Sequence, residues 1–314
     1  MIIDNSLFAF MNKVSLVLLF CLWASVSLLA QPFKEGNVYY DKNKWVEFVP
    51  GNMPLVISVP HGGLINLADV PDRDCPDAVV VIDSHTQDLA RAIDSVFRRD
   101  YHFHPYIVFC NLRRLKVDMN REIELGTCGH EEMRGTWIHW HNMVDTALAM
   151  AVKQYGQSVY IDLHAQGHPE QRLELGYLLK ESELKESFTG GNDTVYTSKA
   201  SINNLISGSK GKLNLKDMLT GTNAFGTWMV ESGFPSVPSK QDPFPYPNQK
   251  YFNGGYNTAR YSKTPNVFGW QIETNYKGVR DTPNAYYSFA EAFVKNIMRY
   301  IATYTTIDVK KMGK

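Results

Sequence analysis

Residues 159–168 place groups that can do chemistry at the end of an apolar run. The run 158–163 is rich in β-branched residues, and polar groups and a glycine follow it, which is typical of a buried parallel strand ending at a sheet edge. Residues two apart in a strand share a face, so Asp162 and His164 should point the same way. A carboxylate beside an imidazole can fix the ring tautomer for metal binding. The alternative is a core histidine hydrogen-bonded to a nearby aspartate.

Three other positions supply matching parts. His61 follows the apolar run 54–60, and Asp83 lies just before a predicted helix, where it could instead be a helix cap together with Ser84. Glu273 lies in the apolar run 267–276. A carboxylate buried in such a run is costly unless it is paired or functional, so Glu273 is either part of a structural ion pair or a reactive group.

Two histidines and one carboxylate, with a fourth position left for water, form the common hydrolytic zinc site. Such a metal polarises a carbonyl and lowers the pKa of water to about 7, and a separate glutamate then serves as the base. An arginine would anchor a substrate carboxylate so that the scissile amide lies over the metal. The predicted parts are the ligands His61, Asp83 and His164, the base Glu273, and Arg121 or Arg172 as the anchor. Zinc is expected from this ligand set.

A dense cluster of charges follows the predicted strand 106–112. Residues 113–122 hold four cations with interleaved carboxylates and an amide, which indicates an anion-binding wall. The alternative is a solvated charged loop. A second loop, 251–258, is rich in glycine and side-chain donors and offers Tyr256 as a substrate contact.

Strands and helices alternate along the chain. Strands are expected at 37–40, 45–49, 54–60, 106–112, 158–163, 172–179 and 267–276, and helices at 86–99, 131–155, 199–207, 214–219, 224–231 and 283–304. This order predicts an α/β sheet between helix layers. In such sheets ligands bind at the strand ends, where the candidate site residues lie.

Composition and charge are those of an ordinary globular domain. The chain has 314 residues, a formal net charge of +0, 44% hydrophobic residues and 20% charged residues. Nothing in this balance supports a nucleic-acid partner. No Pro/Gly/Ser-rich linker divides residues 31–314, so a single catalytic domain is expected there.

The first thirty residues have a different pattern. A lysine at position 13 precedes an almost uncharged run, 14–30, that ends in small residues. This pattern predicts a secretory signal peptide cleaved near Ala30, with Met11 as the true start. The mature protein would then be periplasmic or secreted, with no membrane contact. An uncleaved membrane anchor is the alternative.

Three cysteines remain after cleavage, so at most one pair can form. Cys110 lies in an apolar strand-like run, whereas Cys75 and Cys128 lie in polar, loop-like surroundings. Two of the three could pair in an oxidising compartment, and if a pair forms we expect it to join Cys75 and Cys128. No Cys-x-x-Cys pair is present, which argues against a structural zinc site.

Seven motifs in order resemble the N-formylglutamate amidohydrolase family, which is related to zinc carboxypeptidases of the carboxypeptidase A type. They are Val59-Pro60-His61-Gly62-Gly63, Asp83-Ser84-His85-Thr86, residues 116–122 (KVDMNRE), Asp162-Leu163-His164, residues 172–177 (RLELGY), residues 251–256 (YFNGGY) and residues 271–275 (QIETN). Together they cover about residues 53 to 300.

The resemblance implies a three-layer α/β/α sandwich with a mixed, mostly parallel sheet, like that of zinc exopeptidases, and one catalytic zinc. His61 matches the first ligand, His164 the last and Glu273 the general base. Asn120 and Arg121 match the pair that holds the substrate's terminal carboxylate.

The second ligand departs from the carboxypeptidase pattern. Those enzymes place a glutamate three residues after the first histidine, where this chain has Leu64. Asp83 is therefore the expected ligand, with His85 as the substitute.

The sequence thus predicts an exported zinc amidohydrolase that acts on an N-acyl amino acid or a short peptide with a free carboxylate. Export is a departure from cytoplasmic formylglutamate breakdown. The alternative is a non-catalytic protein that binds carboxylated ligands on the same fold. A serine hydrolase and a nucleotide enzyme rank low, because neither a Gly-x-Ser-x-Gly elbow nor a glycine-rich nucleotide motif is present.

Overall fold

The computed structural model describes residues 33–189, 193–309 and 312–313. Contacts divide the chain into Met1–Lys34 and a second unit, Glu35–Lys314, which carries all candidate site residues. The predicted signal peptide, residues 1–30, lies outside the described residues. Within the described ranges, no helix has both the length and the apolar character needed to cross a membrane.

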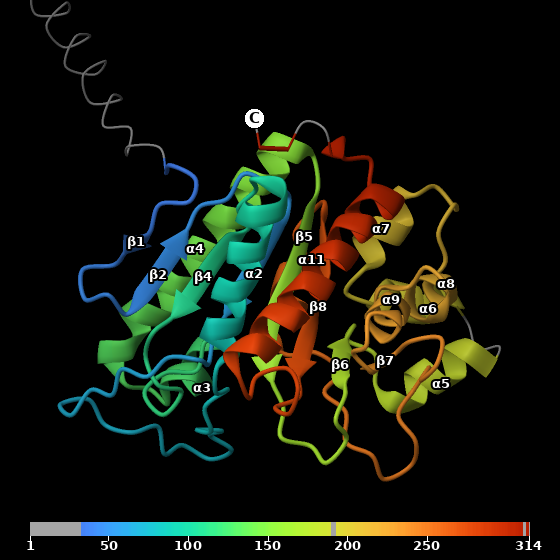
Figure 1. The fold of residues 1–314 in the computed structure, drawn as a ribbon. Coiled ribbons are helices and arrows are strands. Elements are labelled where there is room, and N and C mark those ends of the chain that lie inside the picture. Colours follow the sequence, from blue (N-terminus) through green and yellow to red (C-terminus); the bar gives the residue numbers. More distant parts are fainter. Residues whose placement is uncertain (1–32, 190–192, 310–311, 314) are drawn as a thin grey trace, which may run out of the picture. The chain divides into compact units, whose positions relative to one another are not determined.

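A mixed sheet of eight strands forms the centre of the second unit, as far as the described residues show (Figure 1). The strands, in spatial order, are β1 (Tyr39–Tyr40), β2 (Val46–Val49), β4 (Tyr106–Cys110), β3 (Leu55–Val59), β5 (Ser158–Ala165), β8 (Val267–Thr274), β6 (Leu173–Gly176) and β7 (Ser236–Val237). Strands β4, β3, β5 and β8 are parallel neighbours. Strands β2 and β6 run antiparallel to this central group.

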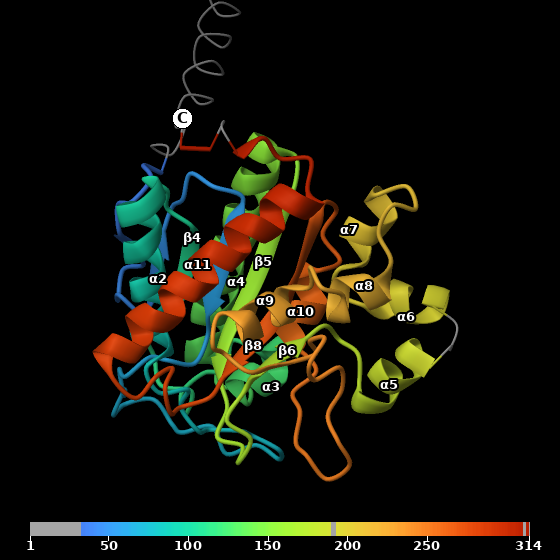
Figure 2. The same cartoon turned by 45° about the vertical axis from the view of Figure 1, so that its right-hand side comes forward.

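Helices cover both faces of the sheet, so the fold is the predicted three-layer α/β/α sandwich (Figures 1 and 2). The helices are α2 (Thr86–Tyr101), α3 (Ile123–Thr127), α4 (Glu131–Tyr155), α5 (Glu181–Thr189), α6 (Asp193–Lys199), α7 (Asn203–Gly208), α8 (Leu215–Thr220), α9 (Phe225–Glu231), α10 (Tyr256–Tyr261) and α11 (Pro283–Tyr304). Helices α2 and α11 pack together on one face, and α4 lies across the other.

Alternation along β5 divides its side chains between the two faces. Val159, Ile161 and Leu163 join the apolar core beneath α2 and α11. Tyr160 lies on the opposite face, where its ring packs against that of Tyr261 in α10, with 5.0 Å between centroids. Because Asp162 and His164 follow at steps of two, they lie on this second face as well.

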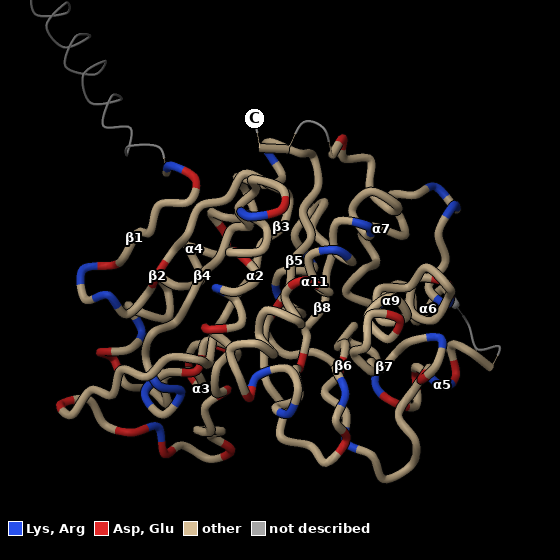
Figure 3. Tube along the Cα trace, in the orientation of Figure 1, with Lys and Arg blue, Asp and Glu red and all other residues tan. Residues whose placement is uncertain are grey.

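The parallel strands deliver their polar residues to one edge, the lower end of the sheet in Figure 1. His164 pairs in register with Glu273 on β8, and Glu273 pairs with Glu174 on β6. Three ionisable side chains from three neighbouring strands therefore share one face at one level of the sheet. Elsewhere, basic and acidic residues are mixed along the described trace (Figure 3), in agreement with the balanced net charge.

Several local predictions were wrong or incomplete. Helix α2 has His85 at its N-cap in a left-handed conformation (φ 65°) and no side-chain cap, so Asp83 and Ser84 do not cap it. The strand expected at 172–179 is confined to residues 173–176. Helices α3, α5 and α6 were not predicted, and α10 begins inside the expected loop 251–258. The helix expected at 199–207 begins only at residue 203, as α7. These helices are short, and short helices are held by tertiary contacts more than by their own sequence pattern.

The predicted pairing of Cys75 with Cys128 is confirmed. The bond joins the long segment between β3 and α2 to the C-terminal end of α3. Cys110 is the free cysteine among the described residues; it is buried in β4, and burial raises the pKa of its thiol to about 12.

Candidate metal centre

Three buried side chains converge at the sheet edge. One ligand atom from each of His61, Asp83 and His164 lies within 4.8 Å of the others, an arrangement that could hold a metal ion. Asp83 Oδ2 lies 3.0 Å from His164 Nδ1 and 3.4 Å from His61 Nδ1. The three residues come from the turn after β3, the segment before α2 and the end of β5. We refer to them as the metal group.

The second ring nitrogen of each imidazole lies close to another carboxylate. His61 Nε2 lies 2.7 Å from Asp118 Oδ1, and His164 Nε2 lies 3.0 Å from Asp162 Oδ2. Both carboxylates are fully buried. A carboxylate at this nitrogen fixes the ring orientation and raises the basicity of the other nitrogen. The predicted role of Asp162 is therefore supported, and Nδ1 of both rings faces the centre of the metal group.

The metal group fits a divalent metal by its chemistry. His61 Nδ1 is buried and has no hydrogen-bond partner among the described residues. A buried nitrogen without a partner is costly, and a metal ion is one of the few groups that can satisfy it in this position. Two imidazole nitrogens and a carboxylate oxygen form the donor set of hydrolytic zinc sites, in which a further position stays open.

Charges around the metal group are strongly coupled. Burial alone would raise the pKa of Asp83, but the imidazoles of His61 and His164 hold that pKa well below its usual value. Burial alone would lower the pKa of His164, whereas Asp162 and Asp83 raise it well above its usual value. The two opposite shifts have one cause, the close approach of the imidazoles to buried carboxylates.

Asp118 stays ionised because cations surround it. Burial would raise the pKa of its carboxyl, but His61, Arg114 and Arg73 together hold it well below its usual value. Arg114 Nε donates to Asp118 Oδ2 at 2.9 Å. The backbone amide of Asn120 donates to Asp118 Oδ1 at 2.8 Å. The carboxylate that orients His61 is therefore itself fixed on both oxygens.

Glu273 lies beside the metal group on the neighbouring strand. Its Oε1 accepts a hydrogen bond of 2.6 Å from Gln271 Nε2, while its buried Oε2 has no partner among the described residues. Burial raises the pKa of Glu273 to about 8, against the opposing effect of His164. A carboxyl with one fixed oxygen, one unpartnered oxygen and a pKa near neutrality can accept and return a proton.

A cavity of about 240 Å³ opens onto these groups. The metal group, Glu273 and Arg121 all line it. Arg121 is partly exposed, and its Nη1 donates to the carbonyl of Asn120 at 2.9 Å. The side chain of Asn120 also lines the cavity, with its Nδ2 3.3 Å from His164 Nε2. A cationic side chain and a metal group thus share one cavity.

Comparison with solved structures identifies one with a similar fold. An N-formylglutamate amidohydrolase from Ralstonia eutropha aligns over 82% of this chain and 98% of its own, with a TM-score of 0.50 and 12% identity. This chain shares its fold with that amidohydrolase. No protein-family model matches the chain, and no curated protein sequence matches it either.

Two weaker structural likenesses accompany the amidohydrolase. A gene product from Agrobacterium tumefaciens covers 84% of this chain and 98% of its own at a TM-score of 0.46 and 13% identity. An N-acetylmuramoyl-L-alanine amidase of Nostoc punctiforme covers 81% of this chain and 99% of its own at a TM-score of 0.30 and 10% identity. At these TM-scores neither adds to the argument, and the amidohydrolase likeness shows the fold alone.

On this amidohydrolase fold the two alternatives for the third ligand occupy different places. Asp83 belongs to the metal group. His85 is partly exposed, and its Nδ1 lies 2.9 Å from Asp88 Oδ2 while its ring stacks on Tyr286. These contacts place the His85 ring outside the metal group, which leaves Asp83 as the ligand that the geometry supports.

Two predicted substrate contacts lie outside the lining of the cavity. Arg172 Nη1 donates to Asp242 Oδ2 at 2.7 Å and to Gln249 Oε1 at 3.0 Å, so its charge is paired within the protein. Tyr256 packs near Trp137, with ring centroids 6.3 Å apart, and its hydroxyl accepts a bond from Arg260. Of the two candidate anchors, Arg121 is the one that reaches the cavity.

Sequence reasoning did not assign roles to Asp118 and Arg114. Both residues belong to the charged segment 113–122 and were interpreted only as part of it, as an anion-binding wall. Their roles depend on His61, which lies 57 residues before Asp118 in the chain. The short spacing of Asp118 and Asn120 after a strand was the available signal, but it names no partner.

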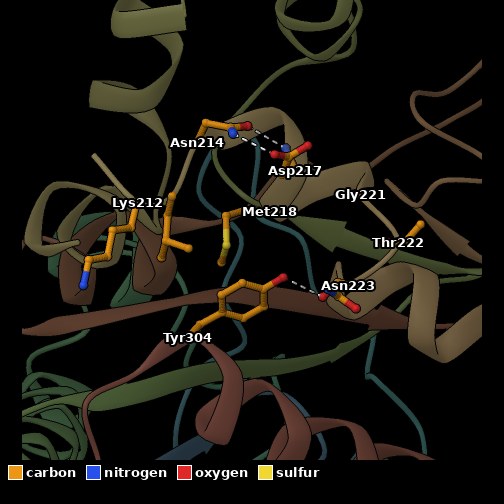
Figure 4. A pocket seen from close by; sticks show the side chains of 9 residues that line it. Lys212, Asn214, Asp217, Met218, Gly221, Thr222, Asn223 and Tyr304 are labelled. Carbon is orange, nitrogen blue, oxygen red and sulfur yellow. Dashed lines mark hydrogen bonds between the residues drawn. The ribbon is translucent and has the colours of Figure 1, made fainter. Parts of the chain in front are cut away.

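A second cavity, of about 330 Å³, lies between α8 and the end of α11 (Figure 4). Asn214 caps α8 there through a bond to the amide of Asp217, and the Tyr304 hydroxyl donates to the carbonyl of Asn223. The lining includes none of the metal group. Its polar side chains complete local backbone structure, so the cavity beside Glu273 remains the candidate active site.

Proposed function

We propose that this protein is an exported zinc-dependent amidohydrolase. Its substrate is an N-acyl amino acid or a short peptide with a free carboxylate. The observation that carries the proposal is the convergence of His61, Asp83 and His164 beside the unpartnered oxygen of Glu273, within one cavity. The fold shared with an N-formylglutamate amidohydrolase supports it.

Zinc held by the metal group would supply Lewis-acid polarisation of the scissile carbonyl and of water. Arg121 binds the substrate carboxylate at the cavity wall and sets the position of the amide. Glu273 takes a proton from the attacking water at Oε2 and passes it to the leaving nitrogen as the carbon–nitrogen bond breaks. A cation at the metal group lowers the pKa of Glu273 by attraction, which favours the base form at neutral pH.

Export is part of the proposal because of the disulfide. Disulfides persist in oxidising compartments and are rare in the cytosol. The Cys75–Cys128 bond therefore agrees with the signal peptide expected from residues 1–30.

The first test is the metal content and the activity of the purified protein. We expect about one zinc per chain by atomic emission, lost in His164→Ala, because the ion needs three protein ligands. Glu273→Gln should keep the metal but lower kcat for N-acyl amino acids by at least about 100-fold, since only the base is removed. Release of the free amino acid measures the reaction.

His85→Ala is the matched control. It removes a histidine close in sequence to Asp83 but outside the metal group, so metal content and activity should match the wild type. Protein that stays metal-free after zinc is supplied, yet binds carboxylated ligands, would favour the non-catalytic alternative. Full activity in Glu273→Gln would show that the base is assigned wrongly.

A further inference from the structure

A further cavity, which we call the outer cavity, adjoins the active-site cavity beside Glu273, which we call the inner cavity. It has a volume of about 440 Å³ and shares Val79, Asp83, Arg114, Ala165 and Phe252 with the inner one. Because Asp83 and Ala165 lie at the boundary, a substrate bond placed at the metal group would send one end into each cavity. The two cavities would therefore hold the two parts of the substrate that flank the scissile amide.

The outer cavity displays apolar side chains that would otherwise be unfavourable at a surface. Val79, Val81, Phe252 and Tyr276 all line it and are 39%, 70%, 45% and 48% exposed. Exposing apolar groups to water is unfavourable. A cluster of exposed apolar side chains therefore indicates a surface that a binding partner or ligand covers. The inner cavity shares Val79 and Phe252 but not Val81 or Tyr276, and its own lining includes Arg121, Asn120, Gln271 and Glu273.

Phe252 is held in place by a buried carboxylate. Glu174 is fully buried, and its Oε2 accepts a bond of 2.7 Å from the backbone amide of Phe252. Its Oε1 lies 2.7 Å from His168 Nδ1, and the His168 ring stacks on Phe252 with 4.6 Å between centroids. A half-exposed ring fixed from beneath by buried polar groups is a preorganised contact surface, which lowers the entropic cost of binding.

Charge in the outer cavity disfavours a cationic occupant. The carboxylate in its lining is Asp83, which belongs to the metal group. Arg114 and Arg280 also line it, and Arg280 uses its guanidinium to donate to the backbone carbonyls of Thr274 and Gln166. A free α-ammonium would meet two cations and no available carboxylate there, so an acyl group fits better than an N-terminal amino acid. The exposed apolar side chains in the lining favour an uncharged acyl group.

We propose that the outer cavity is the acyl subsite and that it takes a large, uncharged, apolar acyl group, aliphatic or aromatic, with Phe252 as its wall. The inference rests on the proposed function, because it assumes that the amide lies at the metal group. It names the substrate class as N-acyl amino acids whose acyl group is much larger than formyl.

The test measures binding in zinc-loaded Glu273→Gln, so that turnover does not interfere. Calorimetry compares glutamate derivatives that carry formyl, acetyl, hexanoyl or benzoyl groups on nitrogen, together with the dipeptide Phe-Glu. We expect the hexanoyl and benzoyl compounds to bind at least about tenfold more tightly than the formyl compound, because they bury apolar area against Phe252. Phe-Glu should bind more weakly than the benzoyl compound.

Substitutions then locate the subsite. In the Glu273→Gln background, Phe252→Ala should reduce the ratio of affinities for large acyl compounds and the formyl compound to within about threefold. Val81→Asp should weaken binding of the hexanoyl compound without changing the fold, since Val81 is 70% exposed. Tyr246→Ala is the control: it removes an exposed aromatic ring that does not line the cavity, and the preference should persist.

Each outcome separates the inference from the proposed function. Equal affinities across the acyl series, or tightest binding of Phe-Glu, would overturn the acyl subsite whatever the activity of the wild type. An unchanged preference in both Phe252→Ala and Val81→Asp would also overturn it. Tighter binding of large acyl compounds that wild-type protein fails to hydrolyse would leave the subsite standing and refute the amidohydrolase function.

Discussion

At the scale of single residues, the metal group depends on carboxylates that do not belong to it. Asp118 is hydrogen-bonded to the outer nitrogen of His61, Asp162 lies 3.0 Å from the outer nitrogen of His164, and both carboxylates are fully buried. Burying two carboxylates without partners would cost several kcal/mol each, so their pairing with the imidazoles and with Arg114 is what makes the arrangement stable. The same pairing leaves the inward nitrogens positioned for a cation.

Asp118→Asn should weaken zinc binding by about 10- to 100-fold, because it replaces the charged acceptor that orients the His61 ring with a neutral amide. Competition with a chelator of known affinity measures the change. Asp88→Asn is the matched control, since Asp88 also contacts a histidine Nδ1 at 2.9 Å, but outside the metal group. Equal losses in the two variants would contradict a specific role for Asp118.

Zinc affinity should rise with pH. Asp162 and Asp83 raise the pKa of His164 well above its usual value, so near neutral pH the metal-free protein carries a proton that zinc must displace. Glu273, whose pKa burial raises to about 8, would lose a second proton as the cation approaches. Below these pKa values the affinity should increase by about tenfold per pH unit for each displaced proton.

The pH dependence is checked by chelator competition at about pH 6 and about pH 8, with calorimetry in two buffers of different ionisation enthalpy to count the protons. Equal zinc affinities at the two pH values, together with no buffer dependence of the enthalpy, would show that His164 is already neutral in the metal-free protein.

At the scale of elements, β5 and β8 form the frame of the site, and their contact is unusually close at one point. Gly269 on β8 lies where an added Cβ would come within 1.7 Å of the Tyr160 carbonyl oxygen. The absence of a side chain at this position lets the two strands keep the register that sets His164 beside Glu273.

Gly269→Ala should lower the free energy of unfolding by about 3 kcal/mol or more, because a backbone must move to admit the methyl group. Gly135→Ala is the control in the second turn of α4, where a Cβ would meet nothing within 4 Å. That change should raise stability by about 0.5–1 kcal/mol through helix propensity. Urea denaturation followed by circular dichroism measures both, and a neutral Gly269→Ala would refute the close contact.

Element prediction from the sequence succeeded where a pattern was long. Helix α4 spans the predicted residues 131–155, and α11 spans 283–304, because many turns of apolar spacing define each of them. His61, His164 and Glu273 could be placed because each follows or interrupts an apolar strand run. The choice between Asp83 and His85 could not be made, since it depends on where the folded chain places the two side chains. Nor could His168, Glu174 and Phe252 be grouped, because they meet only through tertiary contacts.

At the scale of the whole molecule, the Cys75–Cys128 bond links the segment between β3 and α2 to the C-terminal end of α3. Removing it by Cys75→Ser with Cys128→Ser should lower the free energy of unfolding by about 4 kcal/mol, since the bond closes a loop of 53 residues in the unfolded chain. Urea denaturation with and without reductant checks the value. Cys110→Ser is the comparison, and wild-type protein whose stability ignores reductant would contradict the expected contribution.

The positions of the metal group along the chain affect how the protein would fold and unfold. Positions 61, 83 and 164 lie far apart in sequence, and no short segment contains two of them at the spacing of a local metal motif. An unfolded chain therefore offers the ion no preformed binding place, and the group is complete only after β3, β5 and the segment before α2 have assembled. Binding energy gained that late in folding acts mainly on the rate of unfolding, so an occupied centre would prolong the lifetime of the native state while leaving the speed of its formation nearly unchanged.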